Sequence, residues 1–360
     1  MKLASSLALI FGLASAVIAH HGSDSSIVVI PSTPSIGPIK AQYISSSSGL
    51  DGPENKLSKI NSTSLGDIWY FDAVSPDGKY SFIASFWASP SPSYTTALQN
   101  DKILQAQMIL LADDNIYAAN SIFADAAEII TRGDGSSGDW KGTGCSFSGA
   151  EDLSTYTLNF ASPFDIVGSI VLESRAPPHY KCSPAKAGMD MALLPHLGWA
   201  NAIPDAKASV NLEVNGTHVE FTGIGYHDLS WGDVPLFGYC TMYLFGHGRL
   251  GPYSLVWVEV EASDGSKTTS GYVSEDGKIL ATSCSDVVID PEYDSATGKQ
   301  LQGFKVKIDL GEKGVMDVEL AVGKIIGDAG DFITGTGQLS GGLQGGHKYQ
   351  GSALFAAFSP

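Results

Sequence analysis

The sequence predicts an all-β protein that contains two β domains. Three observations favour this fold class. Gly and aromatic residues are abundant, with 41 Gly and 10% Phe, Trp and Tyr in 360 residues. Short runs rich in aromatic and β-branched residues alternate with turns rich in Gly, Asp and Ser. Long helical patterns of apolar residues are scarce. A chain of this length has room for two domains with their own cores.

Composition and charge narrow the class of protein. Apolar residues make up 43% of the chain and charged residues only 16%, which is typical of a globular chain and not of a disordered one. The formal net charge is −17. Such a charge argues against nucleic acid and anionic membrane surfaces as partners.

The first 19 residues are predicted to be a signal peptide. Lys2 supplies the positive charge, and an apolar run extends to Ile18. Val17 and Ala19 match the small-residue rule, which places cleavage before His20. A membrane anchor is the alternative, but the run is short for a bilayer span. We expect passage through the secretory pathway, to the outside or to an endomembrane lumen, and no membrane span in the mature chain.

Sequons and cysteines are compatible with that compartment. Asn61 and Asn215 each begin an Asn-X-Thr triplet and are predicted glycosylation sites. An oxidising compartment also permits disulfides. No CxxC pair occurs, so a zinc or thioredoxin-like site is not predicted. The four cysteines are Cys145, Cys182, Cys240 and Cys284.

In chain order, residues 20–66 are expected to form an extended arm and a loop. The N-terminal domain, residues 67–238, is predicted to be a β-sandwich or a distorted barrel. It begins with a hairpin around a Ser-Pro-Asp-Gly turn at residues 75–78. Strand alternation places Trp69 on one face of this hairpin and Asp72 on the other. Asp72 is then either a hydrogen-bonded edge carboxylate or a group near a pocket.

A long loop is predicted at residues 179–198, and such loops often cover binding sites. Cys182 lies in this loop, and Cys145 lies in another predicted loop of the same domain. We therefore predict a Cys145–Cys182 disulfide that fastens the long loop. A Cys240–Cys284 bridge is left open, because the first and fourth strands of an up-and-down barrel are not neighbours.

The C-terminal domain, residues 239–360, contains eight strand-like runs separated by Gly-rich or acidic turns. Eight sequential strands with short links predict an up-and-down barrel able to hold one small ligand. An acidic stretch at residues 286–294 lacks the spacing of an EF-hand loop. It is interpreted as a solvated turn, and no metal site is predicted.

Polar and aromatic groups are densest between Thr222 and Trp257. Glycines interrupt this stretch and let the backbone bend or approach another group closely. An imidazole, a carboxylate and an indole at one strand end can line a pocket and transfer protons. The alternative is a Gly-rich turn whose His and Asp only satisfy each other. This stretch supplies the candidates Tyr226, His227, Asp228, Trp231, His247, Arg249 and Tyr253.

Within the stretch, the run GIGYHDLSWGD at residues 223–233 resembles the signature of hydroxyneurosporene synthase-like proteins. This group includes bacterial carotenoid hydratases and fungal lipocalin-like Diels–Alderases and epoxide cyclases. Further runs match the family in the same order, at residues 67–82, 174–179, 195–216 and 246–257. The resemblance covers most of the chain.

The resemblance implies a lipocalin-like C-terminal barrel and a cyclase or isomerase of fungal secondary metabolism. The reaction would be an intramolecular Diels–Alder cycloaddition or an acid-assisted epoxide cyclisation or rearrangement. The substrate would be a small apolar polyketide, terpenoid or alkaloid precursor. Ser230 and Phe245 stand where the family usually has Asn and Trp, so the substrate itself is not carried over.

For epoxide chemistry, Asp228 would be the acid, His227 its partner, and Trp231 a wall that stabilises positive charge. On a regular strand His227 and Asp228 point to opposite faces. Without a local bend only one of them can act, and Asp228 is then the candidate. Arg249 is interpreted more readily as a structural pin between the domains. The predicted substrate-binding residues are Tyr226, Trp69, Asp72, His247, Arg249 and Tyr253.

Several chemistries have no motif in the sequence. The chain lacks a G-x-S-x-G elbow, an HExxH pair and a strand–GxGxxG–helix unit. No cofactor is therefore predicted, and the pocket is expected between the two domains. Two other functions stay open, a non-catalytic lipocalin-like carrier and a hydratase of an isoprenoid double bond.

Overall fold

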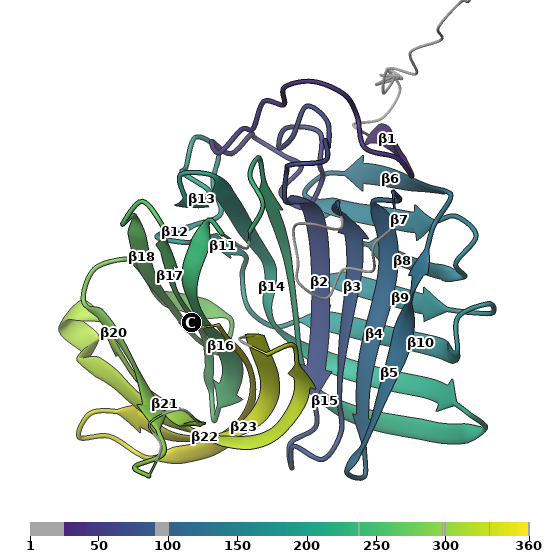
Figure 1. Cartoon of the computed structure of the whole chain (residues 1–360). Coiled ribbons are helices and arrows are strands. Elements are labelled where there is room, and N and C mark those ends of the chain that lie inside the picture. The colour runs from purple at the N-terminus through teal and green to yellow at the C-terminus, as the bar shows by residue number, and fades with distance from the viewer. Residues whose placement is uncertain are drawn as a thin grey trace, which may run out of the picture.

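The computed structural model describes residues 25–90, 101–236, 238–296, 298, 300–330 and 332–358. These residues form two curled antiparallel sheets that lie against each other (Figure 1). The described part of the chain contains no α-helix, and its single helical turn is the 3-10 turn Gly311–Lys313. The all-β prediction is confirmed. The predicted signal peptide, residues 1–19, and the new N-terminus at His20 lie outside the described residues.

The first sheet contains fifteen strands, in the order β1-β6-β7-β8-β9-β10-β14-β15-β2-β3-β4-β5, with three short strands beside that path. The short strands β11, β12 and β13 pair with β14 or with each other. The bounds are β1 Ser25–Pro31, β2 Gly66–Val74, β3 Ser81–Ala88, β4 Leu104–Ala112, β5 Asn115–Phe123, β6 Ala126–Arg132, β7 Gly135–Trp140, β8 Cys145–Gly149, β9 Thr155–Phe160, β10 Ile166–Ser174, β11 His179–Tyr180, β12 Ser183–Pro184, β13 Ala192–Leu194, β14 Leu197–Val214 and β15 Thr217–Gly232.

This sheet curls over its own core. Residues of β2, β3 and β4 pack against residues of β7, β8 and β9 in one buried cluster rich in aromatic rings. Trp69, Phe71 and Ala73 of β2 belong to that cluster, whereas Ile68 and Val74 belong to clusters on the opposite face. The period-two alternation expected for this strand is therefore present, and it gives the sheet a second apolar face.

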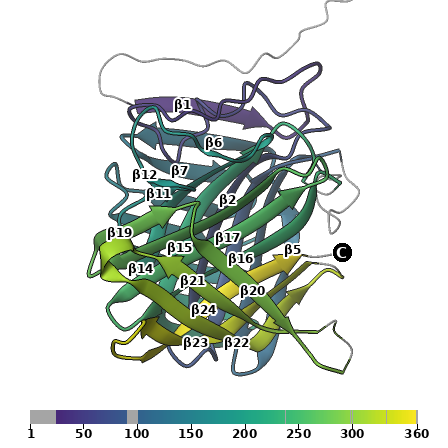
Figure 2. The same ribbon diagram turned by 90° about the vertical axis from the view of Figure 1, so that its left-hand side faces the viewer.

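The second sheet contains nine strands, in the order β19-β18-β17-β16-β24-β23-β22-β21-β20. Its meander is interrupted where β24 inserts between β16 and β23. In Figure 2 this sheet faces the viewer. The bounds are β16 Cys240–Leu250, β17 Tyr253–Ala262, β18 Lys267–Glu275, β19 Lys278–Ser283, β20 Val287–Tyr293, β21 Leu301–Asp309, β22 Val315–Asp328, β23 Phe332–Leu343 and β24 Tyr349–Phe358.

The second sheet has one strand more than the sequence predicted. The additional strand is β20, in the acidic stretch that was interpreted as a turn. Its burial alternates only weakly and its partner β21 lies on one side alone. An edge strand of this kind needs no continuous apolar face, so the sequence pattern does not reveal it. The concave side of the sheet is filled by its own apolar residues, among them Phe304, Met316 and Phe355.

The disulfide prediction was wrong. Cys182 is bonded to Cys284, and Cys145 and Cys240 are buried free cysteines. The reason is the position of the β11–β12 hairpin, which lies over the second sheet. The hydroxyl of Tyr272 on β18 donates to the carbonyl oxygen of Pro177 just before this hairpin, at 3.0 Å. Cys182 is thereby carried towards the end of β19, whereas Cys145 begins β8 inside the first core.

Candidate functional site

A cavity of about 450 Å³ lies between the two sheets. One wall comes from β2, β3, β4 and β15 of the first sheet, and the other from β16, β22, β23 and β24 of the second. A cavity of this size fits a small organic molecule. It was expected between the two domains, and it does lie between the two sheets. The concave interior of the second sheet, by contrast, is a packed core.

The lining of the cavity is mainly apolar and aromatic. Aliphatic side chains such as Leu65, Ile68 and Ile109 form much of it. Five aromatic rings complete the wall, those of Tyr70, Trp87, Tyr243, Phe245 and Phe332. The polar side chains are few, and they are Ser85, Gln107, Asp228, Ser230, Asp328 and Thr334. In such a cavity the apolar walls provide most of the contact with a ligand, and the few polar groups fix its orientation.

Asp228 reaches this cavity because β15 is a central strand without a bend. β15 pairs with β14 on one side and with β2 on the other, and Asp228 lies opposite Asn201 and Tyr70. Tyr226, Asp228 and Ser230 therefore share the face that points towards the second sheet. The motif was expected at a strand end, whereas β15 runs through it and continues to Gly232.

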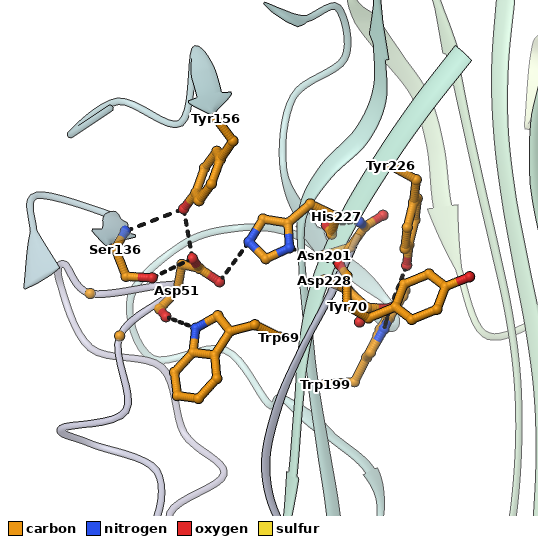
Figure 3. A network of polar contacts seen from close by, with 12 residues as sticks. Asp51, Trp69, Tyr70, Ser136, Tyr156, Trp199, Asn201, Tyr226, His227 and Asp228 are labelled. Carbon is orange, nitrogen blue, oxygen red and sulfur yellow. Dashed lines mark hydrogen bonds and ion pairs between the residues drawn. The ribbon is translucent and has the colours of Figure 1, made fainter. Parts of the chain in front are cut away.

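Two hydrogen bonds hold the Asp228 carboxylate, which is 5% exposed. The indole Nε1 of Trp199 donates to Oδ2 at 2.8 Å, and the hydroxyl of Tyr226 donates to the same oxygen at 2.7 Å (Figure 3). Burial raises the pKa of Asp228 to about 6, and the two donors act against that rise. Asp228 can therefore exchange a proton close to neutral pH.

His227 points away from the cavity, into the first core (Figure 3). Its ring stacks on Phe71, with centroids 3.8 Å apart. Nδ1 donates to the carbonyl oxygen of Tyr70 at 2.9 Å, and Nε2 lies 3.0 Å from Oδ1 of Asp51. Asp51 also accepts hydrogen bonds from Tyr156 and from Ser136. The structure therefore separates the predicted pair, with His227 in the core and Asp228 at the cavity.

Trp231 and Trp69 lie on the same inner face as His227. Nε1 of Trp231 donates to the carbonyl oxygen of Gln42 at 3.1 Å, and the Lys56 ammonium lies 5.2 Å from the centroid of its ring. Nε1 of Trp69 donates to the carbonyl oxygen of Asp51 at 3.0 Å. Both indoles thus bind the segment between β1 and β2 to the first core, and neither lines the cavity.

Asp72 and His247 join the two sheets. Nε2 of His247 on β16 lies 2.9 Å from both carboxylate oxygens of Asp72 on β2, and both side chains are fully buried. The ring of Tyr226 stacks on His247, with centroids 4.4 Å apart. This pair lies next to the hydrogen bonds of Asp228 but does not line the cavity.

Arg249 makes a second connection between the sheets. Its Nε donates to Oδ2 of Asp205 on β14 at 2.8 Å, and one terminal nitrogen donates to the carbonyl oxygen of Ala206 at 2.9 Å. This geometry agrees with the interpretation of Arg249 as a structural pin. Tyr253 belongs to the core of the second sheet, next to Tyr349, and does not reach the cavity.

Several residues of the site were not predicted. Tyr70 and Trp87 could have been found from the first hairpin, since Tyr70 shares the face of Asp72, and Trp87 lies opposite Ile68 in the pairing of β2 with β3. Trp199 could not, because its contact with Asp228 depends on the register between β14 and β15. The contribution of Phe332 and Asp328 depends on the packing of the two sheets, for which the sequence carries no local signal.

Within the described ranges, no group of three or more His, Cys, Asp or Glu side chains is placed to hold a metal ion. No helix in the same part of the chain is long and apolar enough to cross a membrane. The predicted glycosylation residues lie at the surface. Asn215 is exposed in the turn between β14 and β15, and Asn61 is partly exposed and donates through Nδ2 to the carbonyl oxygen of Gly37 at 3.2 Å.

The fold and the cavity define a class of protein, an all-β protein with a buried acid in an apolar cavity between two curled sheets. A family model described as Diels-Alderase-like matches residues 37–320. The chain belongs to the Diels-Alderase-like family.

Three relatives align along most of the chain. The quinolone epoxide rearrangement protein asqO of Emericella nidulans is 30% identical over 96% of this chain and 96% of its own length. The corresponding protein penF of Penicillium thymicola is 31% identical over 88% of this chain and 90% of its own length. The Diels-Alderase cheD of Chaetomium globosum is 26% identical over 73% of this chain and 62% of its own length. These relatives confirm the prediction of an enzyme of the cyclase or isomerase type in fungal secondary metabolism.

Solved structures support the fold. The structure of CghA with Sch210972 is similar with a TM-score of 0.76, at 20% identity, over 92% of this chain and 98% of that chain. Kievitone hydratase from Nectria haematococca is similar with a TM-score of 0.54, at 15% identity, over the same shares of the two chains. At these identities the likeness concerns the fold alone.

Proposed function

We propose that this protein catalyses the acid-assisted rearrangement or cyclisation of an epoxide in a small apolar natural product, with Asp228 as the acid. The observation that carries the proposal is the position of Asp228, a protonatable group at the wall of an otherwise apolar cavity. A general acid is most effective when its pKa lies near the working pH.

The hydrogen bonds of Asp228 decide which oxygen acts. Trp199 and Tyr226 both donate to Oδ2, so Oδ1 is the oxygen that carries the proton of the acid form. Oδ1 transfers this proton to the epoxide oxygen while one carbon–oxygen bond breaks and its electron pair stays on the oxygen, which becomes a hydroxyl. The electron-deficient carbon then receives an internal nucleophile or a migrating group. The proton released in that step returns to the Asp228 carboxylate.

The names of the relatives support epoxide chemistry over cycloaddition. The two relatives that align over 96% and 88% of this chain are both named quinolone epoxide rearrangement proteins. We also propose that the chain is related to hydroxyneurosporene synthase-like proteins. The apolar lining of the cavity supports this relationship, because it suits an apolar natural product.

An intramolecular Diels–Alder reaction is the second candidate function. The apolar lining of the cavity favours it, because such walls can hold a flexible polyene in one reactive conformer. In that reaction Asp228 would donate a hydrogen bond to a carbonyl group and would transfer no proton. A hydratase would use the same acid but would need water in the cavity, and a carrier would need no acid.

The test is to incubate the purified protein with a quinolone epoxide and follow the product by liquid chromatography and mass spectrometry. Asp228→Asn should slow conversion by about 10²–10⁴-fold, because the amide cannot donate the proton. Glu213→Gln makes the same kind of change at an exposed carboxylate on β14 and should keep most of the activity. If Asp228→Asn converts the epoxide at the rate of the unchanged protein, the acid role is refuted.

We also propose that the protein passes through the secretory pathway, as the N-terminal sequence predicts. The Cys182–Cys284 disulfide supports this, because disulfides persist in oxidising compartments.

A further inference from the structure

The ionisable carboxyl groups that line the cavity are not matched by a basic side chain in the lining. Asp228 and Asp328 both line it, and Asp72 lies close enough to Asp228 to raise its pKa further. Among the lining residues that the structure describes, none is Lys, Arg or His. A ligand in this cavity therefore meets acidic side chains and no basic side chain in the described lining.

The basic side chains nearest to the site are already paired. His227 lies 3.0 Å from Asp51, and His247 lies 2.9 Å from Asp72. Arg249 binds Asp205 with its Nε and a terminal nitrogen. All three pairs lie outside the cavity lining. None of these basic side chains can turn to a ligand without leaving a buried carboxylate unpaired, which is unfavourable.

Two donors next to Asp228 are occupied as well. Nε1 of Trp199 and the hydroxyl of Tyr226 both donate to Oδ2 of Asp228. Burial and the Asp228 carboxylate raise the pKa of Tyr226 well above its usual value, so its hydroxyl stays protonated and remains a donor to Asp228. A carboxylate ligand would find no cation in the described lining and only neutral donors such as Ser85 and Gln107, and burying an anion without an opposite charge is costly.

The aromatic rings of the cavity favour the opposite charge. Tyr70, Trp87, Tyr243, Phe245 and Phe332 contribute rings from both walls. The face of an aromatic ring attracts a cation through its quadrupole. The same rings give apolar contact to a neutral aromatic ligand.

We propose that this cavity selects neutral and positively charged aromatic ligands and excludes carboxylates and other anions. The inference rests on the proposed function in that it concerns the same cavity, and it names the class of substrate. A neutral epoxide that gains positive charge as it opens matches these walls. An acidic substrate that is ionised at neutral pH does not.

The experiment compares three ligands of nearly equal size by titration calorimetry at neutral pH. They are naphthylmethylamine, which is a cation, naphthylmethanol, which is neutral, and naphthoate, which is an anion. The amine and the alcohol should each bind at least about tenfold more tightly than naphthoate. Naphthoate binding as tightly as naphthylmethanol would overturn the proposal, and so would a failure of both the amine and the alcohol to bind.

Two variants separate the cavity from the general negative charge of the protein. Asp228→Asn should weaken binding of the amine relative to the alcohol, because it removes a charge at the cavity wall. Glu213→Gln removes one charge from an exposed position on β14 and should leave the ratio unchanged. Equal losses in the two variants would show that the selection comes from the whole surface, against the proposal.

Binding and turnover keep the two proposals distinguishable. The calorimetry contains no chemical step, so charge selection can hold in a protein that fails to convert a quinolone epoxide. In that case the acid role of Asp228 is refuted and the proposed ligand class is kept. If the protein converts the epoxide and also binds naphthoate tightly, the acid role is kept and the ligand class is refuted.

Discussion

At the scale of single residues, the protonation of Asp228 decides how activity depends on pH. The acid form must be present for proton transfer, and burial raises the pKa of this group to about 6. The rate with an epoxide should therefore be highest below about pH 6 and fall as the pH rises through that value. A rate profile measured across this range checks the prediction, and a rate that rises with pH would contradict it.

The donors to Asp228 should set the position of this pH limb. Trp199 and Tyr226 stabilise the carboxylate form, so they hold the pKa of Asp228 lower than burial alone would. In Tyr226→Phe and in Trp199→Phe the pKa should rise, and the falling limb should move to higher pH. Ser230→Ala serves as the control, since Ser230 makes no hydrogen bond to Asp228 in the described contacts. If Tyr226 and Trp199 had only a structural role, their replacement would lower the amount of folded enzyme and would not move the falling part of the pH–rate profile.

Part of this site could be predicted from the sequence. Asp228 was selected by its motif and by strand alternation, which places His227 and Asp228 on opposite faces. Which of the two faces holds a cavity depends on the second sheet, and no local pattern encodes that packing. For the same reason His227 and Trp231 look as suitable for catalysis as Asp228 in the sequence. In the structure both side chains point away from the cavity and contact the segment before β2.

At the scale of elements, β2 and β16 are joined by the Asp72–His247 pair. Both side chains are fully buried, so removing one leaves an unpaired polar group between the sheets. We expect His247→Ala to lower the free energy of unfolding by about 3–5 kcal/mol. Lys305→Ala breaks a solvent-exposed pair with Glu292 and should change stability little. Denaturant unfolding of both variants measures the difference, and equal midpoints would contradict the buried pair's role.

The β11–β12 hairpin is fastened to the second sheet by the Cys182–Cys284 disulfide. Peptide mapping without reduction should recover these two cysteines in one linked product. Cys182→Ser should lower the free energy of unfolding by roughly 2–4 kcal/mol. Cys145 is fully buried, so it should react with thiol reagents only after unfolding. Recovery of a Cys145–Cys182 product would contradict the structure.

The error in cysteine pairing has a physical cause. Four cysteines allow three pairings, and spacing along the chain does not distinguish them. The pairing depends on where the hairpin lies, and its anchors are contacts between distant residues, such as that of Tyr272 with Pro177. The strand β20 was missed for a related reason, because an edge strand lacks the alternation that marks buried strands.

At the scale of the whole molecule, the protein is expected to be processed and glycosylated. Intact-mass analysis of protein from a eukaryotic host should show a chain that begins at His20 and carries hexose, because Asn215 is exposed and Asn61 partly exposed. Treatment with an endoglycosidase should remove the added mass. A retained Met1 together with no added hexose would refute the prediction.

The division of the chain into two β units was open to sequence reasoning because the strand-like runs and their turns are local features. The last strand of the first sheet ends at Gly232, and the first strand of the second begins at Cys240. How the first sheet folds over itself was not open to the same reasoning. That arrangement brings β2 beside β15, two strands separated by more than half of the first sheet's sequence.

The pairing of β2 with β15 has a consequence for how the protein forms on the ribosome. One edge of β2 has no partner until β15 has been synthesised, and one edge of β16 waits in the same way for β24. Neither sheet can be completed while its later strand is still missing, and such long-range pairings form slowly. The nascent chain therefore carries one such open edge for most of its synthesis, first that of β2 and later that of β16. A chaperone that shields strand edges would act on this protein at β2 and β16.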